Sequence, residues 1–166
     1  SGAMSSRGVL FAVTSDIAAA LLHASDDDEL MEIIEEIEES WEEPFVAETD
    51  KAWDAIHRAL SDGTLDPEGG EPPLHCALLG GKHLHEGEDY FVAFVAADDV
   101  PAVARALAAI DAEAFRERYA RIVPHDYAPE YGDEDREYSL AYFQEVVALY
   151  DRAAKAGRAV VFTVDQ

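Results

Sequence analysis

The sequence predicts an α+β fold, in which a small sheet of three to four strands is covered by about six helices. Three segments rich in aromatic and β-branched residues lie far apart, near the beginning, middle and end of the chain. The segments between them carry apolar residues at spacings of three and four, which indicates amphipathic helices. No repeat, low-complexity tract or change in composition divides the 166 residues. We therefore expect one compact domain over 7–166, and residues 1–6 are typical of an expression scar and lead-in.

The predicted strands are short apolar runs bounded by polar or turn residues. They cover residues 8–14 (GVLFAVT), 90–96 (YFVAFVA) and 158–164 (RAVVFTV). The middle run is the clearest strand, because it combines aromatic and β-branched side chains.

Two helices are predicted between the first strand and residue 41. Ser15 is suited to cap the short first helix, and the second spans about 27–40. Five side chains recur on one side of the second helix and are expected to be buried: Leu30, Ile33, Ile34, Ile37 and Trp41. The other side is acidic and carries Glu32, Glu35, Glu36 and Glu39.

The segment 49–60 (TDKAWDAIHRAL) is the most distinctive helix candidate. Thr49 is a suitable N-cap for this helix. Trp53, Ile56 and Leu60 follow on one stripe, so we expect Trp53 to be largely buried against the sheet.

Three more helices are predicted in the second half of the chain. The first opens at Asp98 or Asp99, and the next follows the cap residue Asp111 over about 112–119. The last is long and ends at Ala156, before a glycine that is suited to stop it.

Charge is the strongest compositional signal. The chain has 36 Asp and Glu against 12 Lys and Arg, a formal net charge of −24. This balance disfavours binding to nucleic acid or to anionic membranes, because both modes use clustered Lys and Arg. Residues 16–50 hold fourteen acids and no Lys or Arg. Three interpretations stay open: a solvated surface that aids solubility, a negative surface that attracts a basic partner, or a store of cations. The last is the weakest, because no calcium loop with the required glycine and ligand spacing is present.

Cysteine content and targeting patterns bear on where in the cell the protein is expected. Cys76 is the only cysteine, so an internal disulfide is excluded. The sequence shows neither a signal-peptide pattern nor an apolar run of spanning length. We expect a cytoplasmic protein that carries no cofactor.

Four stretches together resemble one family. They are GVLFAVT at 8–14, DKAWDAIHRAL at 50–60, ALLGGKHL at 77–84 and GRAVVFTV at 157–164, and the DKxWDxxH spacing is the most specific of them. The chain is similar to the YfbM-like bacterial family, a group defined by a domain of unknown function. The resemblance covers essentially the whole chain after residue 6. It implies a compact α+β domain, and it brings no catalytic residues.

Six residues are candidates for a ligand pocket: Lys51, Trp53, Asp54, His57, His83 and His85. Asp54 lies within reach of His57 and could orient its ring as a general base. The alternative is structural: His57 bonds a carbonyl group and holds its helix in place. A strand would put His83 and His85 on one face, which metals exploit, but the standard zinc spacings are absent and we expect no metal.

Six further residues are candidates for a protein interface: Glu32, Glu35, Glu36, Glu39, Tyr127 and Tyr131. The glutamates form the acidic side of the predicted second helix. Exposed tyrosine is typical of interfaces, and the two tyrosines lie in or beside a polar stretch.

These observations support two hypotheses. The first is a non-enzymatic acidic binding protein that engages a basic protein partner, since the sequence contains no complete catalytic set. An antitoxin- or immunity-like protein that masks the basic active site of a toxin is one concrete form. The alternative is a small-molecule-binding or enzymatic domain with a pocket around Trp53, Asp54, His57 and His83.

Overall fold

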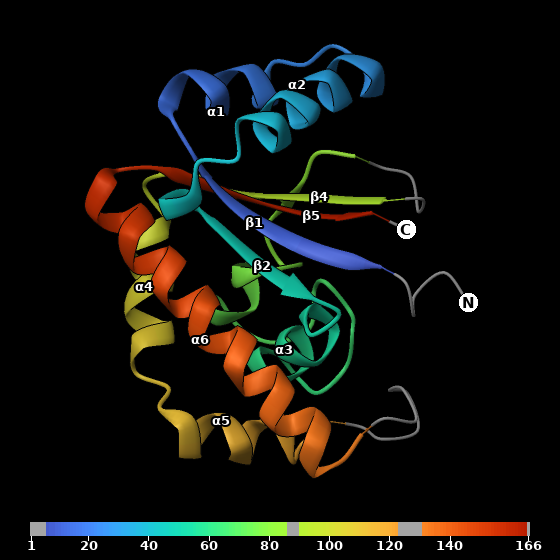
Figure 1. The fold of residues 1–166 in the computed structure, drawn as a ribbon, viewed down its shortest axis with the longest axis vertical. Helices are drawn as coiled ribbons and strands as arrows, with labels where there is room; N and C mark the ends of the chain where they lie inside the picture. Colours follow the sequence, from blue (N-terminus) through green and yellow to red (C-terminus); the bar gives the residue numbers. More distant parts are fainter. Residues whose placement is uncertain (1–5, 86–89, 123–130, 166) are drawn as a thin grey trace.

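A five-stranded antiparallel sheet lies between two layers of helices (Figure 1). The structure is a computed structural model and describes residues 6–85, 90–122 and 131–165. The strand order is β2-β1-β5-β4-β3. The strands are β1 (Arg7–Val13), β2 (Val46–Asp50), β3 (Lys82–His83), β4 (Tyr90–Val95) and β5 (Ala159–Asp165). The α+β class is confirmed, but the expected three to four strands were too few.

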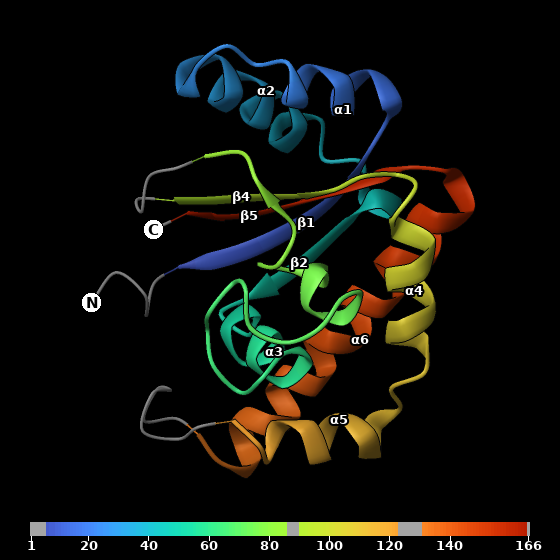
Figure 2. The same cartoon turned by 180° about the vertical axis from the view of Figure 1, so that it is seen from behind.

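The helices divide unequally between the two sides of the sheet (Figures 1 and 2). One side carries α1 (Ser15–Leu22) and α2 (Asp27–Ser40). The other carries α3 (Trp53–Leu60), α4 (Val100–Ala108), α5 (Ala112–Tyr119) and α6 (Asp133–Ala156). Short 3-10 turns, η2 (Glu43–Phe45) and η3 (Leu74–Ala77), complete the described elements. Within the described ranges, no helix has both the length and the apolarity needed to cross a membrane.

Strand β1 lies inside the sheet and contributes side chains to the cores on both sides of it. Its side chains alternate: Leu10 and Ala12 pack on the α3–α6 side, while Phe11 and Val13 pack on the α1–α2 side. Because the side-chain period of a strand is two, a slip of one residue would exchange these sets. Both cores therefore fix the register of β1 against β5, where Leu10 pairs with Phe162.

The two strands that the sequence patterns missed are the edges of the sheet. Strand β2 pairs with β1, and the register shifts between Gly8 and Val9. Strand β3 has only two residues, and Lys82 pairs with Phe94 of β4. Edge strands are short and partly polar, so they lack the apolar run that reveals an interior strand.

Local capping chemistry sets several helix ends. Asp111 caps α5 as expected, since its carboxylate accepts the Ala114 N–H at 2.8 Å. Gly157 ends α6 with φ +68°, the left-handed conformation that glycine adopts at low cost. The cap of α1 is Thr14 and not Ser15: its hydroxyl accepts the Ile17 N–H at 3.4 Å.

The prediction that Trp53 is buried is confirmed. Trp53, Ile56 and Leu60 expose 4%, 0% and 2% of their surfaces. The indole ring lies 6.2 Å from the rings of Phe91 and Phe162, which belong to β4 and β5.

The expected N-cap of this helix was wrong. Thr49 lies in β2, where its hydroxyl donates to the Gly8 carbonyl at 2.7 Å. Helix α3 begins three residues after this strand, at Trp53. Thr49 therefore belongs to a strand because β2 pairs with β1, although its local sequence favours a helix cap.

Candidate functional site

The outer side of α2 is a continuous acidic surface. Leu30, Ile34 and Ile37 are buried on the inner side, against the sheet. The four glutamates Glu32, Glu35, Glu36 and Glu39 are all exposed, and we call them the acidic face. The prediction of five buried side chains is wrong for two of them. Ile33 is only half-buried, and Trp41 is 37% exposed and caps the helix in the left-handed conformation, with φ 37°.

The beginning of α2 is held by two side-chain contacts. Asp26 accepts the Glu29 N–H at 2.9 Å, and the Glu29 carboxylate accepts the Ser25 hydroxyl at 2.6 Å. The Asp26 contact is an N-cap, which satisfies an N–H group that has no partner inside the helix. The acidic side chains of the first turn also stabilise the helix, because they lie at the positive end of its dipole. The helix therefore begins where local sequence dictates, and its register sets the acidic face outward.

The acidic face groups four exposed charges on one side of a helix. Some carboxylates elsewhere form ion pairs, as in Glu137 with Arg116 at 2.8 Å and Asp151 with Lys155 at 2.9 Å. None of the described Lys or Arg side chains forms an ion pair with the acidic face. Its charge is therefore not neutralised within the described fold.

Glu38, between these glutamates, has a raised pKa in the folded protein. Burial raises its pKa, and repulsion from Asp165 and Glu35 raises it further. A carboxyl group with a raised pKa in the folded state favours proton uptake by that state, so this contribution stabilises the fold as pH falls.

A groove of about 390 Å³ lies between the second half of α2 and the sheet. Its apolar lining combines β1, α1, α2, η2 and β2 through Phe11, Val13, Ile17, Ile37, Phe45 and Val46. Glu36 of the acidic face and Glu42 lie among its polar lining residues, together with Arg158. The groove and the acidic face thus share Glu36. This volume is within the range of about 300–1,000 Å³ that is usual for ligand sites.

Arg158 is already engaged at this groove. Its Nη1 donates to a Glu42 carboxylate oxygen at 2.6 Å and to the Ala12 carbonyl at 3.3 Å. Its guanidinium carbon lies 3.7 Å from the centre of the Phe45 ring, a cation–π contact. Because Glu42 compensates this cation, Glu36 gives the lining a net negative charge.

Of the candidate pocket residues, Trp53 and His57 are packed inside the fold. His57 is 1% exposed, and its Nε2–H donates to the Asp66 carbonyl at 3.1 Å. Burial lowers the His57 pKa, although this hydrogen bond opposes the effect. Asp54 accepts from Arg58 at 2.5 Å instead of orienting the imidazole. The geometry matches the structural interpretation of His57, and the carbonyl partner lies in the loop after α3.

His83 and His85 contact opposite layers. His83 Nε2 bonds the Leu79 carbonyl at 2.6 Å, and its ring meets Phe91 edge-on on the α3 side. His85 pairs with Asp27 of α2 at 3.1 Å and stacks on Tyr90 at 3.7 Å. The expectation of both rings on one face was wrong, because β3 ends at His83. Among the described residues, no group of three His, Cys, Asp or Glu side chains is placed to hold a metal.

Lys51, the last of the six, is exposed in the turn between β2 and α3. Its backbone N–H donates to the Tyr138 hydroxyl at 3.4 Å. That hydroxyl in turn donates to Asp50 at 2.7 Å. Lys51 is therefore positioned through its backbone by α6.

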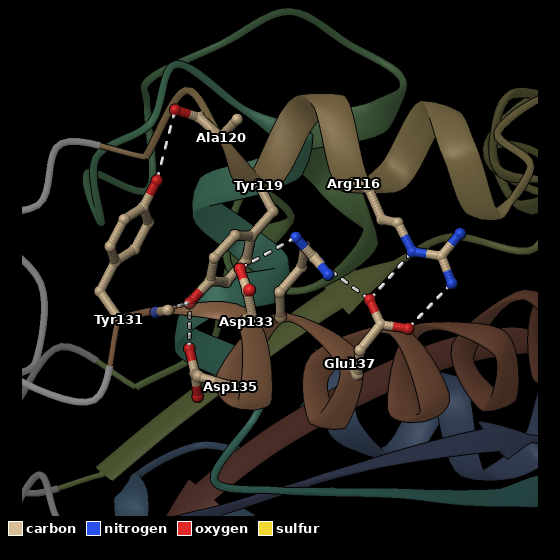
Figure 3. Close-up of polar contacts among 9 residues, drawn as sticks. Arg116, Tyr119, Ala120, Tyr131, Asp133, Asp135 and Glu137 are labelled. Atoms are coloured by element: carbon tan, nitrogen blue, oxygen red, sulfur yellow. Dashed lines mark hydrogen bonds and ion pairs between the residues drawn. The ribbon is translucent and has the colours of Figure 1, made fainter.

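Tyr131 belongs to a network that joins α5 to α6 (Figure 3). Its ring stacks on Tyr119 with centres 5.0 Å apart, and the Tyr119 hydroxyl donates to Asp135 at 2.6 Å. Nearby, Arg116 donates to both carboxylate oxygens of Glu137, at 2.9 and 2.8 Å. Hydrogen bonds from Arg116 and Arg136 lower the Glu137 pKa to about 2. Tyr127, the other candidate tyrosine, lies outside the described residues.

The groove residues are what pattern analysis missed. Phe11 and Arg158 belong to two different predicted strands, and Phe45 to no predicted element, so no sequence pattern places them beside one another. One signal was available: Trp41 directly follows the acidic helix, where glycine is the usual end residue.

Comparison with known proteins gives a family profile and a fold, and no activity. Residues 4–163 match the profile of a domain of unknown function, DUF1877. A crystal structure of YfbM from Escherichia coli, a protein of unknown function, matches with a TM-score of 0.64 at 18% identity. The match covers 95% of this chain and 99% of that one, so the fold is shared over nearly the full length of both. No curated protein matches the sequence.

Proposed function

Because the chain belongs to the DUF1877 family, whose function is unknown, we propose its function from its own surface: it is a non-enzymatic binding protein whose acidic face engages a basic protein partner. The partner presents Lys and Arg to α2. One concrete form is an antitoxin- or immunity-like protein that covers the basic active site of a toxin.

The observation that carries this proposal is the lack of internal cations at the acidic face. Four glutamates stand together on one exposed side of a helix, and none pairs with a described Lys or Arg. A net charge of −24 adds a long-range field of the same sign. Such a field speeds association with a positively charged partner and excludes negatively charged ones.

The proposal predicts strong salt dependence. The Debye length shortens from about 30 Å at 0.01 M to about 8 Å at 0.15 M, so added salt screens the attraction. A complex guided by the acidic face forms more slowly and binds more weakly as salt increases. This dependence distinguishes it from a complex held mainly by apolar contacts.

A capture experiment with two matched charge variants tests the proposal. The first variant replaces Glu32, Glu35, Glu36 and Glu39 with Gln. The second replaces four exposed glutamates of α5 and α6 with Gln: Glu113, Glu117, Glu134 and Glu145. Both remove the same number of charges, so they differ only in location.

The immobilised proteins are exposed to lysate of the native host at low and moderate salt, and bound proteins are identified by mass spectrometry. We expect a basic protein that the wild type and the α5–α6 variant retain, and that the acidic-face variant loses. Equal retention by both variants would contradict a role for the acidic face. Retention of background proteins alone would contradict the proposed function as a whole.

A further inference from the structure

We propose that the groove beside α2 seats one apolar side chain of the basic partner, between Lys or Arg residues that lie against the acidic face. This inference rests on the proposed function and specifies the chemistry of the partner segment. The occupant is an extended or helical protein segment with a single apolar anchor and basic neighbours.

The lining of the groove favours an apolar occupant. Phe11, Val13 and Ile37 form the buried part, with exposures of 2%, 4% and 8%. Two hydroxyl groups in the lining already serve helix ends: Thr14 accepts the Ile17 N–H, and Ser40 donates to the Ile37 carbonyl at 3.0 Å. An apolar side chain therefore gains burial there without displacing a hydrogen bond that it cannot replace.

The charges around the groove favour basic neighbours for that anchor. Glu36 belongs both to the lining and to the acidic face. Arg158 is the cation in the lining of the groove, and its positive charge is already engaged by Glu42 and by the ring of Phe45. A segment anchored in the groove thus has glutamates of α2 alongside it. The same charge argues against a second copy of this chain, which also carries −24.

Trp41 adds an aromatic surface next to the groove. It meets the Phe11 ring edge-on at 5.8 Å and remains 37% exposed. A non-glycine residue at φ 37° is strained, and such strain is concentrated at functional positions. Exposed tryptophan is also enriched in the centres of protein interfaces. The indole therefore extends the apolar surface that a partner segment can cover.

Two labelled peptides test the inference by fluorescence anisotropy in 0.15 M NaCl. Both have the sequence KKSKXKSKK, with leucine at X in one and serine in the other, so their charges are equal. Burial of a leucine side chain corresponds to at least about tenfold in affinity. We expect the leucine peptide to bind the wild-type protein tighter than the serine peptide by that factor.

Variants locate the effect. Val46→Phe fills the groove, whereas Val9→Phe adds the same volume at a half-buried position on the same face of the sheet, outside the lining. We expect Val46→Phe to reduce the leucine-to-serine ratio to near one, with serine-peptide binding unchanged, and Val9→Phe to preserve the ratio. Ile17→Phe is a second filling variant, and thermal melts confirm that each variant is folded.

The outcomes separate the two proposals. Equal binding of both peptides to wild type overturns the groove inference and leaves the acidic face in place. A ratio that survives both filling variants also overturns it. A further variant, Glu32→Gln with Glu35→Gln and Glu39→Gln, should bind both peptides more weakly by about the same factor. If neither peptide binds wild type even at 0.01 M salt, the proposed attraction of basic partners fails as well.

Discussion

The two layers on either side of the sheet differ in how their side chains are used. On the α3–α6 side, large side chains such as Tyr150, Phe115 and Phe143 are fully buried. The Tyr150 hydroxyl donates to the Ala77 carbonyl at 2.7 Å, so even the polar atom of that ring has a partner inside the core. Burial raises the Tyr150 pKa accordingly.

On the α1–α2 side, two helices contribute a smaller core. Leu21, Leu30 and Ile34 are buried there, but Leu22 and Trp41 are 44% and 37% exposed. The groove of about 390 Å³ opens on this side, next to unpaired glutamates. One face of the sheet thus accounts for most of the packing. The other face is covered by α1 and by one stripe of α2, so the outer side of α2 stays exposed.

Two tryptophan substitutions should separate the layers most clearly. Trp53→Ala removes a buried ring from the α3–α6 core, and we expect a loss of about 3–5 kcal/mol in unfolding free energy. Trp41→Ala removes an exposed ring, and we expect a change within about 1 kcal/mol. Urea unfolding followed by circular dichroism measures both. Similar losses for the two variants would show that Trp41 also supports the core.

Replacement of His57 tests the α3–α6 side through pH. His57→Gln should cost about 1–3 kcal/mol at pH 7.5, because the Asp66 carbonyl loses a well-placed donor. Burial lowers the His57 pKa, so its contribution is present above the unfolded value near 6.5 and is lost as pH falls. The stability gap between wild type and variant should therefore narrow from pH 7.5 to 5.5. A constant gap in urea unfolding at the two pH values would contradict a desolvated, neutral His57.

The left-handed end of α2 offers a gain in stability on the weaker side. Trp41→Gly should be about 1 kcal/mol more stable than Trp41→Ala, because glycine adopts φ 37° without a steric cost. Thermal melts of the two variants isolate this backbone effect, since both lack the indole ring. If alanine is equally stable, the strain at Trp41 is not significant. We expect both variants to bind the leucine peptide more weakly than wild type.

The smallest expected effect is the response of the wild type to salt. Like charges one turn apart on a helix cost a few tenths of a kcal/mol per pair, so screening should raise Tm by a few degrees between 0.01 and 0.15 M NaCl. The variant with Gln in place of the four glutamates of the acidic face should respond less than the variant with Gln on α5 and α6. Differential scanning calorimetry measures the difference. Equal responses would mean that the repulsion is spread over the molecule.

Several elements were predictable because their causes are local. The limits of α2 follow from Asp26 and an apolar stripe, the start of α5 follows from Asp111, and the end of α6 follows from Gly157. Strands β1, β4 and β5 are short apolar runs, and their residues do not show the spacing of three and four that indicates a helix. The burial of Trp53 followed from its position on the stripe of α3. In each case, the decisive hydrogen bonds or contacts lie within a few residues or on one periodic face.

The edge strands, the cap of α3 and the groove depend on contacts between distant parts of the chain. Thr49 suits a helix cap, but pairing with β1 places it in a strand, 41 residues from the Gly8 carbonyl that it bonds. The groove brings Phe11, Ile37 and Arg158 together from β1, α2 and the residue before β5. The local sequence does not predict that these side chains are neighbours, because the distances between them depend on strand pairing and on the packing of α2 against the sheet. The spacing of glutamates along α2 is therefore enough to predict the acidic face. The apolar groove beside it forms only when the strands have paired and the helices have packed on the sheet.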